Sequence, residues 1–333
     1  VSNNSNYTNL ATVGNNVTVT FTSSETITTP SVLIGGQAAT VSGSGTSWSA
    51  VKAMASGDTE GVIAIAIDAI DLSDNIGTTA TATTDNSQVT LDRTAPTLTI
   101  NIASDNSTTT LAKPGDDVTL TVTSSENLYQ APTATIDGNA ASVSPSTQTT
   151  SYTATRTMAS GDTDGAVAFV VSGVKDLAGN TVSNVTATTD ASSVRFDSVV
   201  PTVQTVTIAS NNNYDNDNST SLAKAADSVT VSFTTSENIQ TPTVTIAQGT
   251  ATVSGSDAVW SAKIAMTASD PDGAVAFTVD YLDLAGNAGT QVTSVSSGGN
   301  VTFDNTAPTI NTAAIASNNT VTTLAKVGDV VTV

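Results

Sequence analysis

The stretch "VTLTVTSSEN" at residues 118–127 decides the fold, because its apolar residues alternate with threonine. A spacing of two is typical of a β-strand that buries one face. The stretch returns as "VTVTFTSSET" at residues 17–26 and as "VTVSFTTSEN" at residues 229–238. A second alternating run also occurs three times, at Ile63, Ile65 and Ile67, at Val167, Phe169 and Val171, and at Val275, Phe277 and Val279. The sequence therefore predicts the same half-buried strands in three copies.

Other motifs keep the same register and define a tandem repeat. Prolines of an Asp-x-x-x-Pro motif stand at positions 96, 201 and 308, which are 105 and 107 residues apart. "DLAGN" occurs at residues 176–180 and 283–287, with a looser copy, "DLSDN", at residues 71–75. We expect repeats at residues 1–93, with a truncated first strand, at 94–198 and at 199–305, and the truncated start of a further repeat at 306–333. The chain is thus expected to be a piece of a longer protein.

The strand pattern predicts an all-β fold of tandem immunoglobulin-like antiparallel β-sandwiches. About seven short strands fall within roughly a hundred residues of each copy, with turn residues between them. Threonine, serine, asparagine, aspartate and glycine fill the rest of the chain, and these residues are weak helix formers. Almost no helix is expected.

The charge and the missing residue types exclude several functions. The chain has 9 basic and 29 acidic residues, a net charge of −20, and neither histidine nor cysteine. A negative field of this size repels nucleic acid and anionic lipid and attracts cations. Without histidine and cysteine the chain cannot build a Ser-His-Asp triad, a cysteine nucleophile or the common zinc sites. No apolar run is long enough for a membrane span. We expect a protein that is not an enzyme, does not bind nucleic acid and does not insert into a membrane.

The combined motifs resemble a known family of repeats. The ordered series "SEN", "GDTDG" and "DLAGN" between two Asp-x-x-x-Pro motifs is similar to the bacterial and archaeal Ig-like, or cadherin-like, tandem repeats of large surface adhesins and surface-layer proteins. The resemblance covers the whole chain. It implies an extracellular, secreted prokaryotic protein whose partners are neighbouring copies of itself or other surface proteins and glycans.

The acidic residues of neighbouring copies are expected to meet where the copies join. In this type of sandwich the loops after "SSEN" and "DLAGN" lie at the end where the domain begins, and they face the last strand of the preceding copy. For the first joint the candidate ligands are Asp92, Glu126, Asp176 and Asn180. For the second they are Asp197, Glu237, Asp283 and Asn287, and the "GDTEG" and "GDTDG" turns add Asp58, Glu60, Asp162 and Asp164.

Two interpretations of these residues stay open. Ca²⁺ binds six to eight hard oxygens, which carboxylates, amides and backbone carbonyls supply. An ion shared across a linker as short as "DRTAP" at residues 92–96 would lock the angle between two domains. Alternatively, aspartate, asparagine and glycine are ordinary turn residues that bind nearby backbone groups.

Three functions fit the sequence. The first is a non-enzymatic extender or stalk of a prokaryotic cell-surface adhesin or extracellular fibre, stiffened by Ca²⁺ at the joints. The second is a surface-layer or sheath lattice protein that assembles through lateral contacts. The third is a glycan-binding accessory module.

Overall fold

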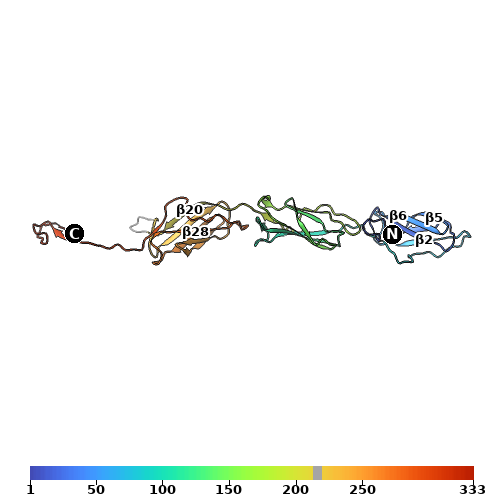
Figure 1. The fold of residues 1–333 in the computed structure, drawn as a ribbon, viewed down its shortest axis with the longest axis horizontal. Coiled ribbons are helices and arrows are strands. Elements are labelled where there is room, and N and C mark those ends of the chain that lie inside the picture. Colours follow the sequence, from blue (N-terminus) through green and yellow to red (C-terminus); the bar gives the residue numbers. More distant parts are fainter. Residues whose placement is uncertain (213–219) are drawn as a thin grey trace. The chain divides into compact units, whose positions relative to one another are not determined.

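The computed structural model describes residues 1–212 and 220–333, and every regular element within these ranges is a β-strand. No helix in this part of the chain is long and apolar enough to cross a membrane. The chain divides into two compact units, Val1–Val199 and Val200–Val333. The first unit contains two β-sandwiches, and the second contains a third sandwich and the C-terminal segment (Figure 1).

The second sandwich displays the full strand pattern. One sheet has the order β10-β12-β16-β15, and the other has the order β14-β13-β18. The strands of the first sheet are β10 (Leu98–Ser104), β12 (Asp117–Ser124), β16 (Ser151–Thr157) and β15 (Ser142–Ser144). Those of the second are β14 (Asn139–Ala140), β13 (Thr133–Ile136) and β18 (Phe169–Ser172). The chain leaves the first sheet after β12, returns to it at β15 and crosses again after β16, as in an immunoglobulin-type sandwich. The predicted fold class is confirmed.

A small third sheet contains one strand from near the start and one from the end of this sandwich's sequence. It has the order β11-β19-β17, with strands at Leu111–Ala112, Arg195–Phe196 and Gly165–Ala166. Strands β11 and β19 run parallel, whereas β17 and β19 run antiparallel. The last strand of the sandwich is therefore paired directly with the region near its start.

The third sandwich repeats the arrangement, and its strands β20 and β28 belong to different sheets (Figure 1). The sheet orders are β20-β22-β26-β25, β24-β23-β28 and β21-β29-β27. The first sheet contains β20 (Val203–Ser210), β22 (Ser228–Thr235), β26 (Val259–Ala265) and β25 (Thr252–Ser256). The remaining strands are β24 (Gly249–Thr250), β23 (Thr243–Ile246), β28 (Phe277–Asp280), β21 (Leu222–Ala223), β29 (Thr302–Phe303) and β27 (Gly273–Ala274).

The first sandwich differs from the others at one edge. Its sheet orders are β2-β6-β5, β4-β3-β8 and β1-β9-β7. These strands are β2 (Asn16–Thr22), β6 (Ser47–Ala53), β5 (Thr40–Ser44), β4 (Gln37–Ala38), β3 (Ser31–Ile34), β8 (Ile65–Asp68), β1 (Leu10–Ala11), β9 (Thr90–Leu91) and β7 (Gly61–Val62). Strand β2 corresponds to β12 and β22, but its sheet has three strands where theirs have four.

Each sandwich has a separate apolar core, built from the alternating residues that the sequence singled out. Val118, Leu120 and Val122 are at most 1% exposed, and the threonines between them lie on the other face. Trp48, Tyr152 and Trp260 take the same place in the three copies and are buried. Their polar atoms bond to backbone carbonyls, as in the bond from Trp260 Nε1 to Asp257 O (3.1 Å). These rings are core residues and do not form an exposed platform.

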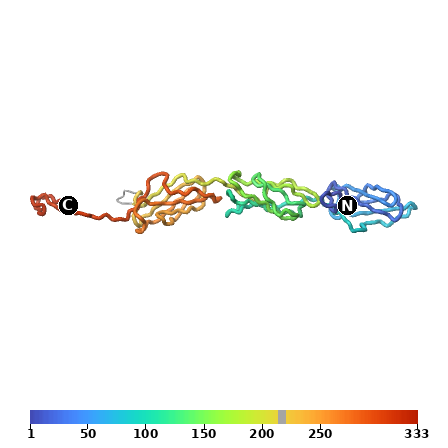
Figure 2. The backbone as a smooth tube through the Cα atoms, in the orientation of Figure 1, coloured from blue at the N-terminus to red at the C-terminus, as the bar shows by residue number. Residues whose placement is uncertain are grey.

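The chain after the third sandwich contains one short pair of strands, β30 (Ala316–Ser317) and β31 (Val331–Thr332). Residues 307–315 form no regular element and are exposed. Figure 2 shows this stretch as a single extended tube beyond the sandwich. The exact boundaries of the four repeats remain a prediction.

Candidate metal centre

The "DLAGN" loop is closed by its own aspartate. In the second sandwich Asp176 Oδ1 accepts hydrogen bonds from the backbone N–H groups of Gly179 (2.6 Å) and Asn180 (2.8 Å). Its Oδ2 accepts a bond from the Asn180 side-chain amide (2.8 Å). Gly179 has a φ of +106°, which favours glycine at this point of the turn. The spacing of acid and amide is thus explained locally by turn chemistry.

The same loop is built in the other two copies, but its burial differs. Asp71 accepts bonds from the Asn75 N–H (2.8 Å) and side-chain amide (2.7 Å) and is half-buried. Asp283 makes the same pair of bonds with Asn287, at 2.8 and 2.7 Å, and is 1% exposed. Asp176 is fully buried. Burying a carboxylate costs free energy unless hydrogen bonds or an opposite charge offset the loss of water. The environment of the loop therefore matters most in the second and third copies, where the aspartate is buried.

Three carboxylates come together where the first sandwich meets the second. One oxygen each of Asp92, Glu126 and Asp176 lies within 4.8 Å of the others. Asp92 directly follows β9 in the first sandwich, Glu126 follows β12, and Asp176 forms an isolated bridge with Leu128. The three salt bridges found among the described residues involve other acids, so this group has no basic partner in a salt bridge.

Burial and nearby negative charge raise the pKa values of two of these acids, Asp92 and Glu126. Partial burial raises the pKa of Asp92 above 3.8, and the negative charges of Asp176 and Glu60 raise it further. Burial likewise raises the pKa of Glu126 above 4.5, with added repulsion from Asp92, Asp176 and Glu60. A raised pKa means that the charged carboxylate is disfavoured relative to the protonated acid. The group therefore holds negative charge at a free-energy cost that a bound cation would relieve.

Asn180 connects the loop to the first sandwich rather than offering a free oxygen. Its side-chain N–H donates to the backbone carbonyl of Asp92 (3.1 Å), and its Oδ1 accepts from the Thr12 hydroxyl. The Asn4 side chain donates to the Ala178 carbonyl (2.6 Å), and Asn4 is 7% exposed. The loop is thus held by residues of two sandwiches.

Aromatic residues add a second contact at this joint. The rings of Tyr7 and Tyr129 meet edge to face, with centroids 6.3 Å apart. Lys175 Nζ lies 4.4 Å from the centre of the Tyr129 ring, and the Tyr7 hydroxyl bonds to the Gln148 side chain. Sequence reasoning missed Asn4, Tyr7, Thr12 and these partners. The one available signal was Tyr7, an aromatic residue in a polar loop of a chain with only 5 tyrosines.

In the "GDTEG" and "GDTDG" turns the second acid binds the chain segment that follows the last strand of the sandwich, whereas the first acid pairs with a basic residue. Glu60 accepts bonds from the Arg93 N–H (2.7 Å) and the Thr94 hydroxyl (2.9 Å), and Asp164 accepts one from the Ser198 N–H (2.7 Å). The second acid of each turn therefore holds the chain that leaves the sandwich. The Thr94 and Arg93 bonds lower the pKa of Glu60.

The structure does not place Asp58 or Asp162 with the acidic group, as the sequence had suggested. Asp58 pairs with Lys52 (2.5 Å) and Asp162 pairs with Arg156 (2.6 Å). Hydrogen bonds from these basic residues lower the pKa of both acids. In each case the carboxylate forms an ion pair with a basic residue six positions earlier in the sequence, so it does not lie at the joint.

The candidates for the second joint belong to different units. Asp197 lies near the end of the first unit, where its Oδ1 accepts a bond from the Val199 N–H (3.0 Å). In the second unit Asp283 is held by Asn287, its carbonyl accepts a bond from the Gln240 side chain (2.9 Å), and the Glu237 carbonyl accepts one from Thr235 (2.6 Å). The convergence of these four candidate ligands stays a prediction.

Comparisons with known proteins yield structural matches only. No protein-family model matches the chain, and no curated protein matches it in sequence. Among solved structures, the I9–I11 tandem of titin matches with a TM-score of 0.31 and 11% identity, over 88% of this chain and 94% of that one. The full ectodomain (Ig1–Ig3) of mouse nectin-like molecule 4 matches with a TM-score of 0.30 and 9% identity, over 91% of this chain and 99% of that one.

Proposed function

We propose that this chain is a non-enzymatic extender of a prokaryotic cell-surface adhesin or extracellular fibre, in which Ca²⁺ stiffens the joints between sandwiches. The observation that carries the proposal is the group of Asp92, Glu126 and Asp176, which brings acids of two sandwiches together. In this role the chain works outside the cell, and its partners are neighbouring copies or other surface proteins and glycans.

The spacing of the three oxygens suits a calcium ion. Ca²⁺–O distances of about 2.3–2.6 Å limit two oxygens on the same ion to a separation of about 5 Å. The three carboxylate oxygens lie within 4.8 Å of one another, which meets this limit. Backbone carbonyls and water would complete the six to eight ligands that the ion needs.

The burial and charge of the group also favour an ion. Asp176 is fully buried, and burial and like charge raise the pKa values of Asp92 and Glu126. A divalent cation offsets this repulsion, whereas the turn bonds of Asp176 satisfy one acid only. Turn chemistry explains the spacing of the loop, and the ion accounts for the gathering of three acids.

Such an ion would restrict motion at the joint. Asp92 belongs to the first sandwich and Glu126 and Asp176 to the second, so a shared ion connects two bodies that are otherwise joined by a short linker, Asn4, Thr12 and the Tyr7–Tyr129 contact. We expect the joint to hold one angle when the ion is bound and to sample several when it is removed.

The test combines calorimetry and small-angle scattering on the full chain. Calorimetry should show that the wild type binds Ca²⁺. Scattering should show a larger maximum dimension with Ca²⁺ than in a buffer that contains a calcium chelator. Glu126→Gln should remove one binding event and part of the calcium-dependent extension. Glu25→Gln is the matched control, because Glu25 takes the same place in the first copy, where it is exposed and outside the acidic group.

Two results would contradict the proposal. One is an unchanged maximum dimension of the wild type on calcium removal. The other is an equal loss of binding in the Glu126 and Glu25 variants, which would assign the affinity to general negative charge.

A further inference from the structure

Tyr7 and Tyr129 bring two phenol rings together across the joint between the first and second sandwiches. Their ring centroids lie 6.3 Å apart, and the planes of the rings cross at 84°. Aromatic pairs at this separation and angle are in direct contact. Tyr7 lies in the loop before β1, and Tyr129 follows the bridge between Leu128 and Asp176. Rings from two different sandwiches are therefore neighbours.

A long hairpin loop of the second sandwich holds this pair of rings. Residues 145–150 connect β15 to β16, whereas only two residues connect the corresponding strands in each of the other two sandwiches. Within the long loop, the side-chain N–H group of Gln148 donates to the Tyr7 hydroxyl (2.9 Å) and to the Tyr129 carbonyl (2.9 Å). One side chain thus positions both tyrosines.

The two rings stay accessible to solvent while they are held. Both are half-buried, and Lys175 Nζ lies over the Tyr129 ring, 4.4 Å from its centre. By contrast, Tyr152 and Tyr281 are 1% and 5% exposed. Among the tyrosines that the structure describes, those of the joint are therefore the ones that a dissolved oxidant reaches.

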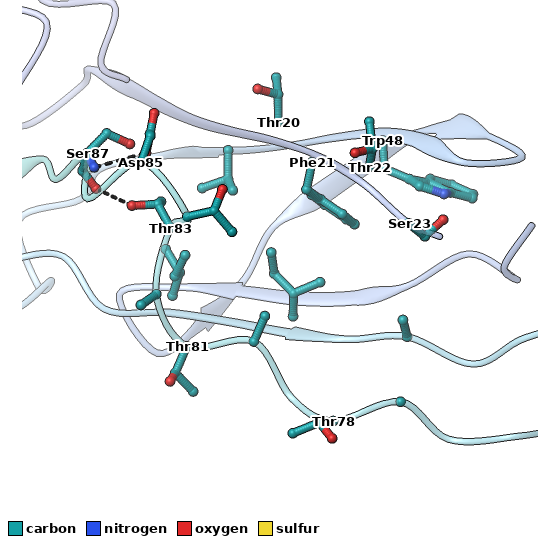
Figure 3. Close-up of a pocket in the computed structure, with 18 of the residues that line it drawn as sticks. Thr20, Phe21, Thr22, Ser23, Trp48, Thr78, Thr81, Thr83, Asp85 and Ser87 are labelled. Carbon is teal, nitrogen blue, oxygen red and sulfur yellow. Dashed lines mark hydrogen bonds between the residues drawn. The ribbon is translucent and has the colours of Figure 1, made fainter. Parts of the chain in front are cut away.

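An aromatic pair elsewhere in the first sandwich lacks this chemistry. Phe21 and Trp48 are opposite residues of β2 and β6, and Figure 3 shows both beside the cavity of this sandwich. A phenylalanine ring has no hydroxyl group from which a proton can leave, and Trp48 is 8% exposed. Two phenols in contact are what distinguishes the joint.

We propose that the joint is a site of oxidative cross-linking, at which Tyr7 and Tyr129 of one chain become linked as dityrosine. The oxidant is hydrogen peroxide, used by a haem peroxidase that acts on the chain from outside. The product joins the first and second sandwiches covalently. The proposal does not depend on the calcium site.

The reaction removes one hydrogen atom from each tyrosine. Each phenol loses an electron to the oxidised haem and its hydroxyl proton to solvent, which leaves a neutral phenoxyl radical. The unpaired electron spreads to the ring carbons beside the oxygen, the Cε atoms. A bond forms between one Cε atom of each ring, and the hydrogens on these two carbons then move to the oxygens and restore both phenols. One peroxide molecule is reduced to two waters.

The contact between the rings decides which tyrosines pair. A phenoxyl radical forms dityrosine only if a second radical lies close to it. In the folded chain the partner of Tyr7 is already in contact, whereas a tyrosine of another chain has to arrive by diffusion. At low protein concentration the link within one chain should therefore dominate.

The first test treats the dilute full chain with hydrogen peroxide and a haem peroxidase. Tyr214 lies outside the described residues, so phenylalanine replaces it in every sample. Dityrosine fluorescence should appear in a product that runs as a single chain on a denaturing gel. Peptide mass mapping should find the peptides of Tyr7 and Tyr129 joined, with a mass lower by two hydrogen atoms than their sum.

Single substitutions identify the partners. Tyr7→Phe and Tyr129→Phe should each abolish the link within the chain. Tyr281→Phe is the matched control and should leave the yield unchanged, because this tyrosine is buried in the third sandwich. Links that form only between chains, or a yield that Tyr7→Phe does not lower, would overturn the proposal.

The second test concerns the loop that holds the rings. Gln148→Ala removes a bond to each tyrosine and should lower the yield of the link within the chain. Gln130→Ala is the control, because Gln130 is exposed and adjoins Tyr129 in the sequence. Equal yields from the two variants would contradict the positioning role of Gln148.

The third test measures the effect of the link on unfolding, in a buffer that contains a calcium chelator. The link closes a loop of about 120 residues, which restricts the unfolded chain and so favours the folded state. The linked chain should therefore unfold at a higher denaturant concentration than the untreated chain, whereas treatment of Tyr7→Phe should cause no such shift. A linked chain that unfolds at a lower concentration would mean that the link distorts the joint, which would overturn the proposal that the rings are native neighbours.

Discussion

Asp176 serves two purposes with one side chain. Its two oxygens accept three hydrogen bonds that close the loop, and one of its oxygens also lies within 4.8 Å of those of Asp92 and Glu126. The turn bonds are made in all three copies. The group of three acids also needs Asp92, which comes from the neighbouring sandwich. Asp71 of the first copy keeps the same turn bonds in an exposed loop. The two residues can therefore separate turn stability from the effects of burial.

We predict that Asp176→Ala lowers the free energy of unfolding of the first unit by about 2–4 kcal/mol, because it leaves three partly buried N–H donors without their acceptor. Asp71→Ala should cost about 1 kcal/mol or less, since water replaces the lost acceptor. Denaturant unfolding of the full chain measures both. Equal costs would mean that burial of the loop adds nothing.

A second prediction concerns pH. The pKa values of Asp92 and Glu126 are raised, so the folded protein binds their protons more tightly than the unfolded chain does. In chelator, the contribution of this pair to stability is therefore fully present below the ordinary values of 3.8 and 4.5 and is lost as pH rises through the raised ones.

Glu126→Gln should consequently raise the unfolding temperature at pH 7 in chelator, by about 2 °C, and change it little at pH 3. Calcium should stabilise the wild type at pH 7 and the variant less. Scanning calorimetry at the two pH values, with and without calcium, measures the effect. A lower unfolding temperature of the variant in chelator would show that the charged Glu126 stabilises the joint.

The sequence identified the acids of the first joint but not the residues that hold them. Asp92, Glu126 and Asp176 could be found because they recur at fixed places in the repeat. Asn4, Thr12 and Tyr7 could not, because they lie in an irregular loop whose contacts depend on how two sandwiches pack. The pairing of Asp58 with Lys52 depends on where a strand and a turn meet, which an alternating pattern does not reveal.

At the scale of elements, the alternating pattern predicted the long strands correctly but not the shortest ones. Strands such as β12 carry three apolar residues at alternate positions on one face, a signal that chance rarely produces. Strands β1, β11 and β21 have two residues each, too few for any periodicity. Each pairs in parallel with the last strand of its sandwich, β9, β19 or β29. This pairing depends on the tertiary fold, which brings the end of the repeat back beside its start.

The edge of β2 should be measurably less stable than its counterpart. Val19 and Val231 are the same residue at the same place in two copies, but Val19 is half-buried and Val231 fully buried. We predict that Val231→Ala costs about 2 kcal/mol and Val19→Ala about 1 kcal/mol or less. Hydrogen exchange of β22 and β2 measures each cost locally. A larger cost at Val19 would mean that its side chain is already enclosed.

At the scale of the whole molecule, the net charge of −20 sets how cations reach the joint. The field of 29 acids attracts Ca²⁺ from all sides, but salt screens it. The Debye length falls from about 30 Å at 0.01 M ionic strength to about 8 Å at 0.15 M. Screening should therefore remove the long-range part of the attraction and leave the contribution of the three nearby acids.

We predict that Ca²⁺ affinity falls as KCl is raised through this range, and that Glu126→Gln lowers the affinity at every salt concentration. Titration calorimetry of the full chain measures both trends. An affinity of the wild type that disappears at about 0.15 M salt would mean that binding rests on the diffuse field alone.

The parallel pairing of β11 with β19 determines how the second sandwich responds to a pull on its two ends. Tension drags these neighbouring strands along their own axes in opposite directions, so it loads their hydrogen bonds in shear, all at once rather than one after another. The seven paired positions between β10 and β12 resist sliding in the same way. The second sandwich thus resembles a lap joint, in which resistance to a pull grows with the number of paired positions in the overlap.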